Sequence, residues 1–263
     1  SLLKPKNYGH HENANFNRYT MKTVPDSEMF AMFNVRGGYT CINQRKVTAN
    51  IPNYPNYDPS KPTTYIRYVD VNSLYPTAMV NNLPLRDFQW ENPALFTTEY
   101  ILSLKDEEFG RGYRLTVDLT YPPEVQDATV DLPLCIENYE VQDADLSPYN
   151  LKLRGDSKIV STDKLVGSCR DKKEYTLDYR LLQYVLQKGM ILTKVHKVIS
   201  YIQGHCFDDF INGEVANRAK LKGSDRELPK LLMNSVYGKT IEDKTRHNDS
   251  HIMNLETDLE KIK

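Results

Sequence analysis

The sequence predicts an α+β fold, and three patterns carry that prediction. Residues 65–71 are dense in aromatic and β-branched side chains, which is typical of a mostly buried strand. Leucine and valine repeat at helical spacing over 177–186, Gly189 ends that pattern, and 190–201 then has the composition of a strand. Apolar spacing over 207–222 predicts a further helix, closed by a tip at Gly223 and Ser224.

Composition is that of a folded chain without strong electrostatic character. The 263 residues are 40% hydrophobic, enough for a sizeable core, and the net charge of −1 excludes a protein that coats DNA through its overall field. No apolar run reaches the length of a membrane span and no signal peptide is apparent, so we expect an intracellular protein, in cytoplasm, nucleus or organelle, with no membrane partner. Its four cysteines are widely spaced, which favours reduced thiols.

A first motif, YVDVNSLYP, spans residues 68–76. Asp70 comes near the end of the predicted strand and before a turn, where a carboxylate and a backbone carbonyl can hold a hard cation such as Mg²⁺. Asn72 and Ser73 favour a helix start whose amides face an anionic group. The alternative is that Asp70 caps a helix and Tyr75 is a packing aromatic.

A second motif, KLLMNSVYGKT, spans residues 230–240. On a helix, Asn234 lies about 40° and Tyr237 about −20° from Lys230, so the three side chains share one face. A lysine at one end and polar or flat groups at the other suit a nucleoside triphosphate. Gly238 would let nucleic acid approach the backbone or would end the helix. The alternative is an ordinary amphipathic helix with a solvated lysine.

Together the motifs resemble those of family B DNA polymerases, D-x-x-S-L-Y-P in the palm and K-x-x-x-N-S-x-Y-G in the fingers. Longer runs over 57–90, 112–134 and 171–199 are similar to the organellar and viral, protein-primed branch, especially Polinton (Maverick) polymerases. The resemblance implies a partial family B polymerase core with palm strands, a mixed α/β insertion and antiparallel helical fingers. It divides the chain into a polar leader (1–20), a palm segment (21–88), an insertion that contacts terminal protein and template (89–203), fingers (204–240) and the start of a connecting region (241–263).

The resemblance also implies residue roles. Asp70 is the matching catalytic carboxylate and, with the Val71 carbonyl, a Mg²⁺ ligand. The implied nucleotide-binding residues are Ser73, Leu74, Tyr75, Arg218, Lys230, Asn234 and Tyr237, with Tyr75 packing against the sugar and Lys222 a second choice to Arg218. The implied DNA-binding residues are Arg36, Gly37, Gly38, Ser235, Gly238 and Lys239, although the tyrosine that usually precedes the two glycines is absent.

One departure limits the expected activity. Family B enzymes carry a second palm carboxylate in a D-T-D motif after the fingers, and none precedes Lys263. We therefore expect a fragment of a DNA-directed DNA polymerase, inactive alone, that supplies part of a two-metal Mg²⁺ site and works with primer-template DNA, deoxynucleoside triphosphates, a terminal protein primer and the remainder of the core. The alternative is a non-catalytic relic or split subunit that binds nucleic acid or terminal protein.

Overall fold

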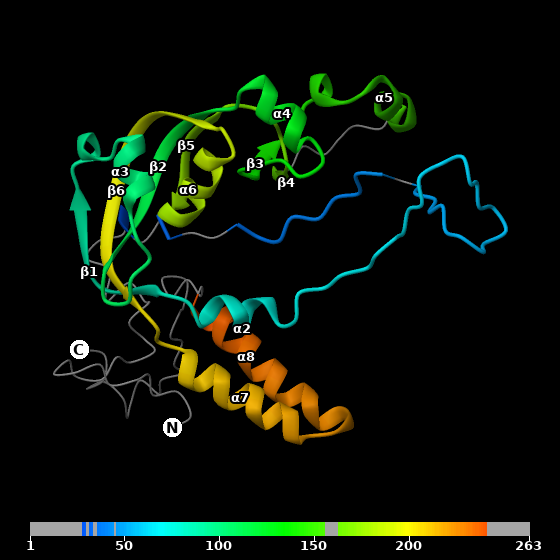
Figure 1. The fold of residues 1–263 in the computed structure, drawn as a ribbon. Coiled ribbons are helices and arrows are strands. Elements are labelled where there is room, and N and C mark those ends of the chain that lie inside the picture. Colours follow the sequence, from blue (N-terminus) through cyan, green and yellow to red (C-terminus); the bar gives the residue numbers. More distant parts are fainter. Residues whose placement is uncertain (1–27, 30–31, 34–35, 45, 156–162, 241–263) are drawn as a thin grey trace, which may run out of the picture.

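The computed structural model describes residues 28–29, 32–33, 36–44, 46–155 and 163–240. Its described elements form a mixed α and β arrangement with antiparallel sheets. A curved sheet with its covering helices lies at one side, and a pair of long helices projects from it (Figure 1). We call the described part of 83–204 the sheet body, and the helices on either side of it in sequence the helical body.

The main sheet has four antiparallel strands in the order β1-β6-β2-β5. They are β1 (Leu83–Glu91), β2 (Arg111–Thr120), β5 (Lys172–Asp178) and β6 (Ile191–Gly204). The strand predicted over 190–201 is confirmed as β6, which pairs with both β1 and β2. Because β2 is flanked on both edges, its backbone groups find partners along its length.

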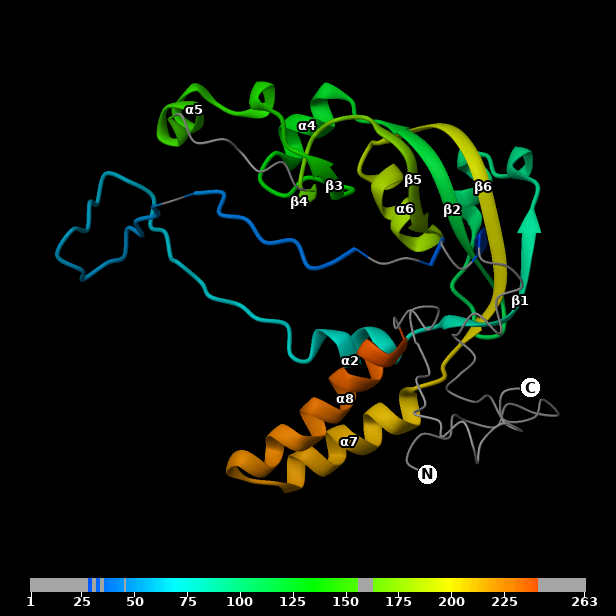
Figure 2. The same cartoon turned by 180° about the vertical axis from the view of Figure 1, so that it is seen from behind.

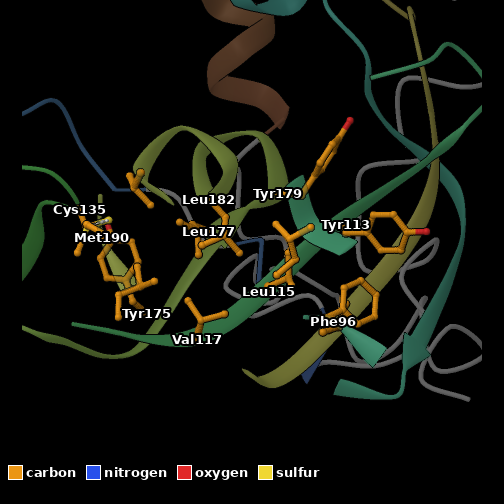
Figure 3. Packing of buried hydrophobic residues seen from close by; sticks show 14 of the residues in the cluster. Phe96, Tyr113, Leu115, Val117, Cys135, Tyr175, Leu177, Tyr179, Leu182 and Met190 are labelled. Atoms are coloured by element: carbon orange, nitrogen blue, oxygen red, sulfur yellow. Dashed lines mark hydrogen bonds between the residues drawn. The ribbon is translucent and has the colours of Figure 1, made fainter. Parts of the chain in front are cut away.

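The principal core lies between this sheet and two helices, α3 (Thr98–Ser103) and α6 (Tyr179–Gln187). Leu115, Val117 and Leu119 alternate along β2 and are fully buried, as expected for one face of a strand. Figure 3 shows several of these side chains packed with Tyr175, Leu177 and Leu182. Burial raises the pKa of Tyr113 and of Tyr179 to about 12, because a phenolate is poorly solvated in this core.

Helix α6 begins at a capping aspartate and ends before a glycine. The Asp178 carboxylate accepts a hydrogen bond from the Arg180 amide, at 3.0 Å, and so caps the first turn. Gly189 has a φ of +102°, and a Cβ there would lie 2.8 Å from Val125. The predicted helix over 177–186 is thus confirmed from Tyr179 onward, whereas Leu177 belongs to β5 because it pairs with Leu115.

The opposite face of the sheet has a smaller apolar cluster. Met29, Met32 and Phe33 from the N-terminal part pack against Phe88, Ile199 and Tyr201. Phe33 meets Phe88 edge to face, with ring centroids 5.6 Å apart. The sheet is therefore covered on both faces by elements from different parts of the chain.

A second, two-stranded sheet adjoins the first. It consists of β3 (Glu137–Glu140) and β4 (Asp163–Val166); α4 (Pro123–Thr129) precedes it in the chain and α5 (Pro148–Arg154) lies between its two strands in sequence. Lys172 of β5 is fully buried and donates to the Glu137 carboxylate and to the Ser168 carbonyl. A buried ammonium needs such partners, so Lys172 ties the small sheet to the large one.

The helical body contains α2 (Leu74–Met79), α7 (Asp208–Lys220) and α8 (Glu227–Thr240). Helices α7 and α8 lie side by side and antiparallel, joined through the 3-10 turn Gly223–Arg226 (Figures 1 and 2). This confirms the helix predicted over 207–222 and its tip. The shared core comprises Met79, Cys206, Phe207, Ile211, Met233 and Val236.

The buried strand predicted over 65–71 is wrong. These residues have no strand assignment and are exposed, with Tyr68 94% and Val69 73% accessible. The segment leads into α2 from a long connection (Figure 2), and no described strand pairs with it. β-branched and aromatic composition favours extended backbone, but burial also requires neighbouring strands or helices that pack against it.

Part of that connection is organised by one side chain. Asn50 Nδ2 donates to the carbonyls of Asp58, Lys61 and Pro62, and Asn50 Oδ1 accepts from the Asp58 amide at 2.8 Å. Asp58 Oδ1 accepts in turn from the Ser60 amide at 3.0 Å. The proline-rich stretch over 50–64 is thus a closed loop.

Two predicted regions lie outside the described residues, the polar leader (1–20) and the connecting region (241–263). Among the helices that the structure does describe, none is both long and apolar enough to cross a bilayer.

Candidate functional site

The first motif forms the start of α2. Ser73 adopts a left-handed conformation (φ 49°, ψ 55°) at the N-cap, and its carbonyl accepts from the Thr77 amide at 2.9 Å. Thr77 Oγ1 donates to the Asn72 carbonyl at 3.2 Å. Pro76 and Met79 are buried against the helical body, whereas Leu74 and Tyr75 are exposed. The helix is therefore anchored by Pro76 and Met79 and presents Leu74 and Tyr75 of the motif on its exposed face.

The second motif lies on α8, which also has one buried face and one exposed face. Pro229, Met233 and Val236 form its buried face. Lys230 and Asn234 are exposed, and Tyr237 is half-buried. By helix geometry these three share the face that the sequence predicts, roughly 10 Å long from Lys230 to Tyr237.

The two motifs meet through their tyrosines. The rings of Tyr75 and Tyr237 stack with centroids 4.3 Å apart and an interplanar angle of 18°. Burial, and next the proximity of Tyr75, raise the pKa of Tyr237, so its phenol stays neutral at physiological pH. Residues far apart in sequence thus form one continuous aromatic surface between α2 and α8.

Cationic groups occur on both long helices. The Lys230 ammonium is half-exposed and lies 3.9 Å from the Glu227 carboxylate, a loose contact one turn away. Arg218 of α7 is partly buried, and its Nε has no hydrogen-bond partner. Lys222 is exposed beyond the end of α7. Lys230 is thus free to bind an anion in place of solvent.

Sequence reasoning missed Glu214. This carboxylate is 8% exposed on the inner face of α7, four residues before Arg218. Glutamate and arginine at this spacing are common on solvated helices, so the sequence carried no signal that Glu214 is buried.

Asp70 and Val71 lie just before α2 and are exposed. Within the described residues, Asp70 has no hydrogen bond or ion pair. A free carboxylate next to a backbone carbonyl suits Mg²⁺, which binds through one or two carboxylates and completes its shell with water and phosphate. In the same described part of the chain, three or more acidic, histidine or cysteine side chains do not gather at any point. The described donors fit a partial Mg²⁺ site.

The predicted DNA-binding residues fall in two places. The Arg36 guanidinium stacks on the Tyr175 ring, 3.9 Å from its centroid, and Arg36 Nη1 donates to the Thr176 carbonyl at 3.0 Å. Gly37 and Gly38 follow with open space around them. This group therefore lies on β5 of the sheet body.

The others are on α8. Ser235 Oγ donates to the Leu231 carbonyl at 2.7 Å, and Lys239 is exposed. The prediction that Gly238 ends the helix is wrong, because α8 continues to Thr240. There is open space beside Gly238. The other prediction for this residue, that nucleic acid approaches its backbone, stays a prediction.

Comparisons with known proteins give a faint likeness. No protein-family model matches the chain, and no curated protein matches it. Two solved structures of phi29 DNA polymerase match, each at a TM-score of 0.37 over 65% of this chain and 25% of that chain. One is a complex with primer-template DNA and incoming nucleotide, at 17% identity, and the other is an orthorhombic crystal form, at 18%. At this TM-score and identity, evidence for function comes from the residues of the chain itself.

Proposed function

We propose that this chain is part of a DNA-directed DNA polymerase and binds the incoming deoxynucleoside triphosphate between α2 and α8. The observation that carries the proposal is the stacked pair of Tyr75 and Tyr237. Two motifs that each suit a nucleotide face one another across this contact. A packing aromatic at Tyr75 would also stack on Tyr237, but that alternative gives no role to Lys230 and Asn234, which are exposed on the same face of α8.

The aromatic surface fits the sugar and base. Tyr75 is 47% exposed, so part of its ring remains available to a ligand. In this role it packs against the deoxyribose and leaves little room for a ribose 2′-hydroxyl, while Tyr237 and Asn234 lie near the nascent base pair. Tyr75→Ala is then expected to reduce the preference for deoxyribonucleotides over ribonucleotides, which competition binding measures; an unchanged preference would refute the sugar contact.

The cations fit the phosphates. Lys230 lies about two helical turns from Tyr237 on the same face, a distance that suits a triphosphate whose base lies at the tyrosine. A charged hydrogen bond from its ammonium stabilises the bound anion. Arg218 is the second cation, and the amides of Ser73 and Leu74 are proposed to bind phosphate oxygens at the start of α2.

Asp70 and the Val71 carbonyl are the residues that would hold Mg²⁺. An ion held there would neutralise charge on the transferring phosphate. The side chain of Asp70 needs no conformational release to take this role, because its carboxylate has no partner in the described part of the chain.

The rest of the proposal concerns the complete enzyme. Arg36, Gly37, Gly38, Ser235, Gly238 and Lys239 contact primer-template DNA, and residues 89–203 meet a terminal protein primer in a Polinton-type, protein-primed enzyme inside the cell. Palm (21–88) and fingers (204–240) flank that insertion. The remainder of the core brings the second carboxylate and covers the exposed 65–71 segment.

Calorimetric titration with Mg²⁺ and a deoxynucleoside triphosphate tests the proposal. We expect Lys230→Ala to weaken binding roughly tenfold to a hundredfold, because a hydrogen bond to a charged group contributes about 1.5–3 kcal/mol. Lys152→Ala, which removes an exposed lysine of α5, is the matched control and should bind as the wild type does.

Equal affinity of wild type and Lys230→Ala would contradict the assignment. A wild-type chain that binds DNA but no triphosphate would instead support the alternative, a non-catalytic binding relic or split subunit.

A further inference from the structure

In the part of the chain that the structure describes, the helical body joins the sheet body where β1 begins and β6 ends. The chain enters the sheet at Leu83 and leaves it at Gly204, and these two residues are register partners at the end of β1 and β6. Among the described residues, the strand side chains that pack on the core of the helical body are Leu83 and Leu85. So small an apolar contact leaves the angle between the bodies to other interactions.

A polar hub lies at this junction, centred on Asp106. Asp106 Oδ1 accepts from Asn82 Nδ2 and from Gln203 Nε2, both at 2.9 Å. Asn82 immediately precedes β1 and Gln203 immediately precedes Gly204. One carboxylate oxygen therefore accepts hydrogen bonds at both places where the chain passes between the two bodies. The side chains of Asn82 and Gln203 are both buried.

Further contacts fix the hub to the sheet body. Arg180 Nη1 donates to the Asn82 carbonyl at 3.0 Å and lies 3.4 Å from Asp106 Oδ2. The hydroxyl of Tyr179, at the start of α6, lies 3.3 Å from Asp106 Oδ1. Gly112 leaves room for the Gln203 side chain, because a Cβ at position 112 would lie 2.5 Å from Gln203 Oε1. Asp106 itself lies in the loop between α3 and β2 and its side chain is 41% exposed, so these contacts from buried partners hold it in place.

The charge of Asp106 suits this role. Burial raises the pKa of its carboxyl, but the Asn82 hydrogen bond and the Arg180 charge outweigh burial and leave the pKa below its usual range. The carboxylate is therefore ionised at neutral pH, the form that accepts from several donors at once.

A second contact, made by His205, lies near the same junction. His205 Nδ1 lies 2.5 Å from the carbonyl of Val80, the C-cap of α2. His205 lies between β6 and α7, so this bond joins the end of the helix that carries Tyr75 to the start of the helix that carries Arg218. Together with the hub, this bond connects the end of α2 and the start of α7 to each other and to the sheet body.

We propose that the Asp106 hub is the positioning device that sets the angle of the helical body on the sheet body and thereby the geometry of the nucleotide site. Only the effect on the nucleotide site rests on the proposed function; the effect on the angle between the two bodies does not. Asp106, Asn82 and Gln203 are positioning residues, because they act through α2 and α7 and contact no nucleotide.

The test compares Asp106→Ala with Asp143→Ala in the full chain. Asp143 also has an exposed carboxylate paired with an arginine, Arg154 of α5, but α5 lies away from β1 and the start of α7 (Figure 1). Hydrogen exchange should quicken in Asp106→Ala at 80–83 and 204–211 and stay slow in the centre of β2. Affinity for Mg²⁺ and a deoxynucleoside triphosphate should fall roughly fivefold to tenfold, a common size for coupling between sites. Asp143→Ala should change neither.

Asp106→Asn guards against a variant that fails to fold, because it keeps an acceptor for Asn82 and Gln203 and loses the charge facing Arg180. It should give a smaller change in both readouts. Wild-type exchange at the junction in both variants would overturn the inference, and so would an opened junction with unchanged nucleotide affinity. If the wild type bound no triphosphate, the proposed function would fail, and quicker exchange confined to the junction would still support the orienting role.

Discussion

Two segments with nearly the same sequence pattern have opposite environments. Residues 68–71, Tyr-Val-Asp-Val, and residues 116–119, Thr-Val-Asp-Leu, share the central valine and aspartate. Val117 is fully buried in β2, whereas Val69 is 73% exposed. The difference lies in neighbours, because β2 has β5 on one edge and β6 on the other.

The two aspartates differ in the same way. Asp118 Oδ1 accepts from the Glu174 amide at 2.8 Å and lies 2.9 Å from His196 Nε2, with Lys173 also nearby. Asp70 has no partner within the described residues. A carboxylate whose oxygens are occupied holds structure together, and one whose oxygens are free can bind a cation. The same dipeptide therefore serves stability in one place and, in our proposal, chemistry in the other.

The largest expected effect is on catalysis. In the complete enzyme, Asp70→Asn should slow primer extension by about a thousandfold or more, because loss of several kcal/mol of metal-borne charge stabilisation costs a factor of ten for each 1.36 kcal/mol. Asp118→Asn should retain extension at temperatures where it is folded. A primer-extension assay distinguishes them, and undiminished extension by Asp70→Asn would remove the metal assignment.

The next effect is on stability. Val117→Ala should lower the free energy of unfolding of this chain by about 2–3 kcal/mol, because it removes two buried methyl groups and leaves a cavity. Val69→Ala, the matched change at an exposed site, should stay within about 0.5 kcal/mol of wild type. Urea unfolding measures both. Similar losses in the two variants would mean that 65–71 is buried in solution.

A smaller effect is expected on the stability of the chain at low pH. The Glu174 amide holds the pKa of Asp118 below its ordinary value, with help from His196 and Lys173 against the opposing effect of burial. Its stabilising contribution is therefore present above the unfolded pKa of about 3.9 and is lost as pH falls through the folded pKa. Asp118→Asn should be less stable than wild type at pH 6, and the gap should narrow below about pH 4.

Urea midpoints between pH 3 and pH 7 follow this change, with Asp70→Asn as the control that should track wild type throughout. A gap of constant size across this range would show that Asp118 acts through shape and not through charge.

Sequence patterns predicted elements whose stabilising contacts are local. The α7–α8 pair, the stop of α6 at Gly189 and strand β6 follow from spacing and from turn residues near each element. The 65–71 strand failed because its composition cannot tell whether a neighbouring strand is present. Gly238 failed as a helix end because a single glycine within a helix costs only about 1 kcal/mol relative to alanine.

The site was predictable in its parts and not in its assembly. Helix geometry places Lys230, Asn234 and Tyr237 on one face, and the first motif predicts the helix start at Asn72 and Ser73, which α2 confirms with Ser73 as its N-cap. Nothing in the sequence alone indicates that Tyr75 stacks on Tyr237, or that Glu214 is buried. Asp106 escaped notice because its partners Asn82 and Gln203 are distant in sequence and match no motif.

The most direct test of the account is a double-mutant cycle on Tyr75 and Tyr237, with affinity for Mg²⁺ and a deoxynucleoside triphosphate as the readout. If the stacked rings form one binding surface, the two alanine substitutions should be non-additive by about 0.5–1.5 kcal/mol, the double variant losing less than the sum of the single variants. Strictly additive losses, or single variants that bind as tightly as wild type, would contradict a nucleotide site shared by the two motifs.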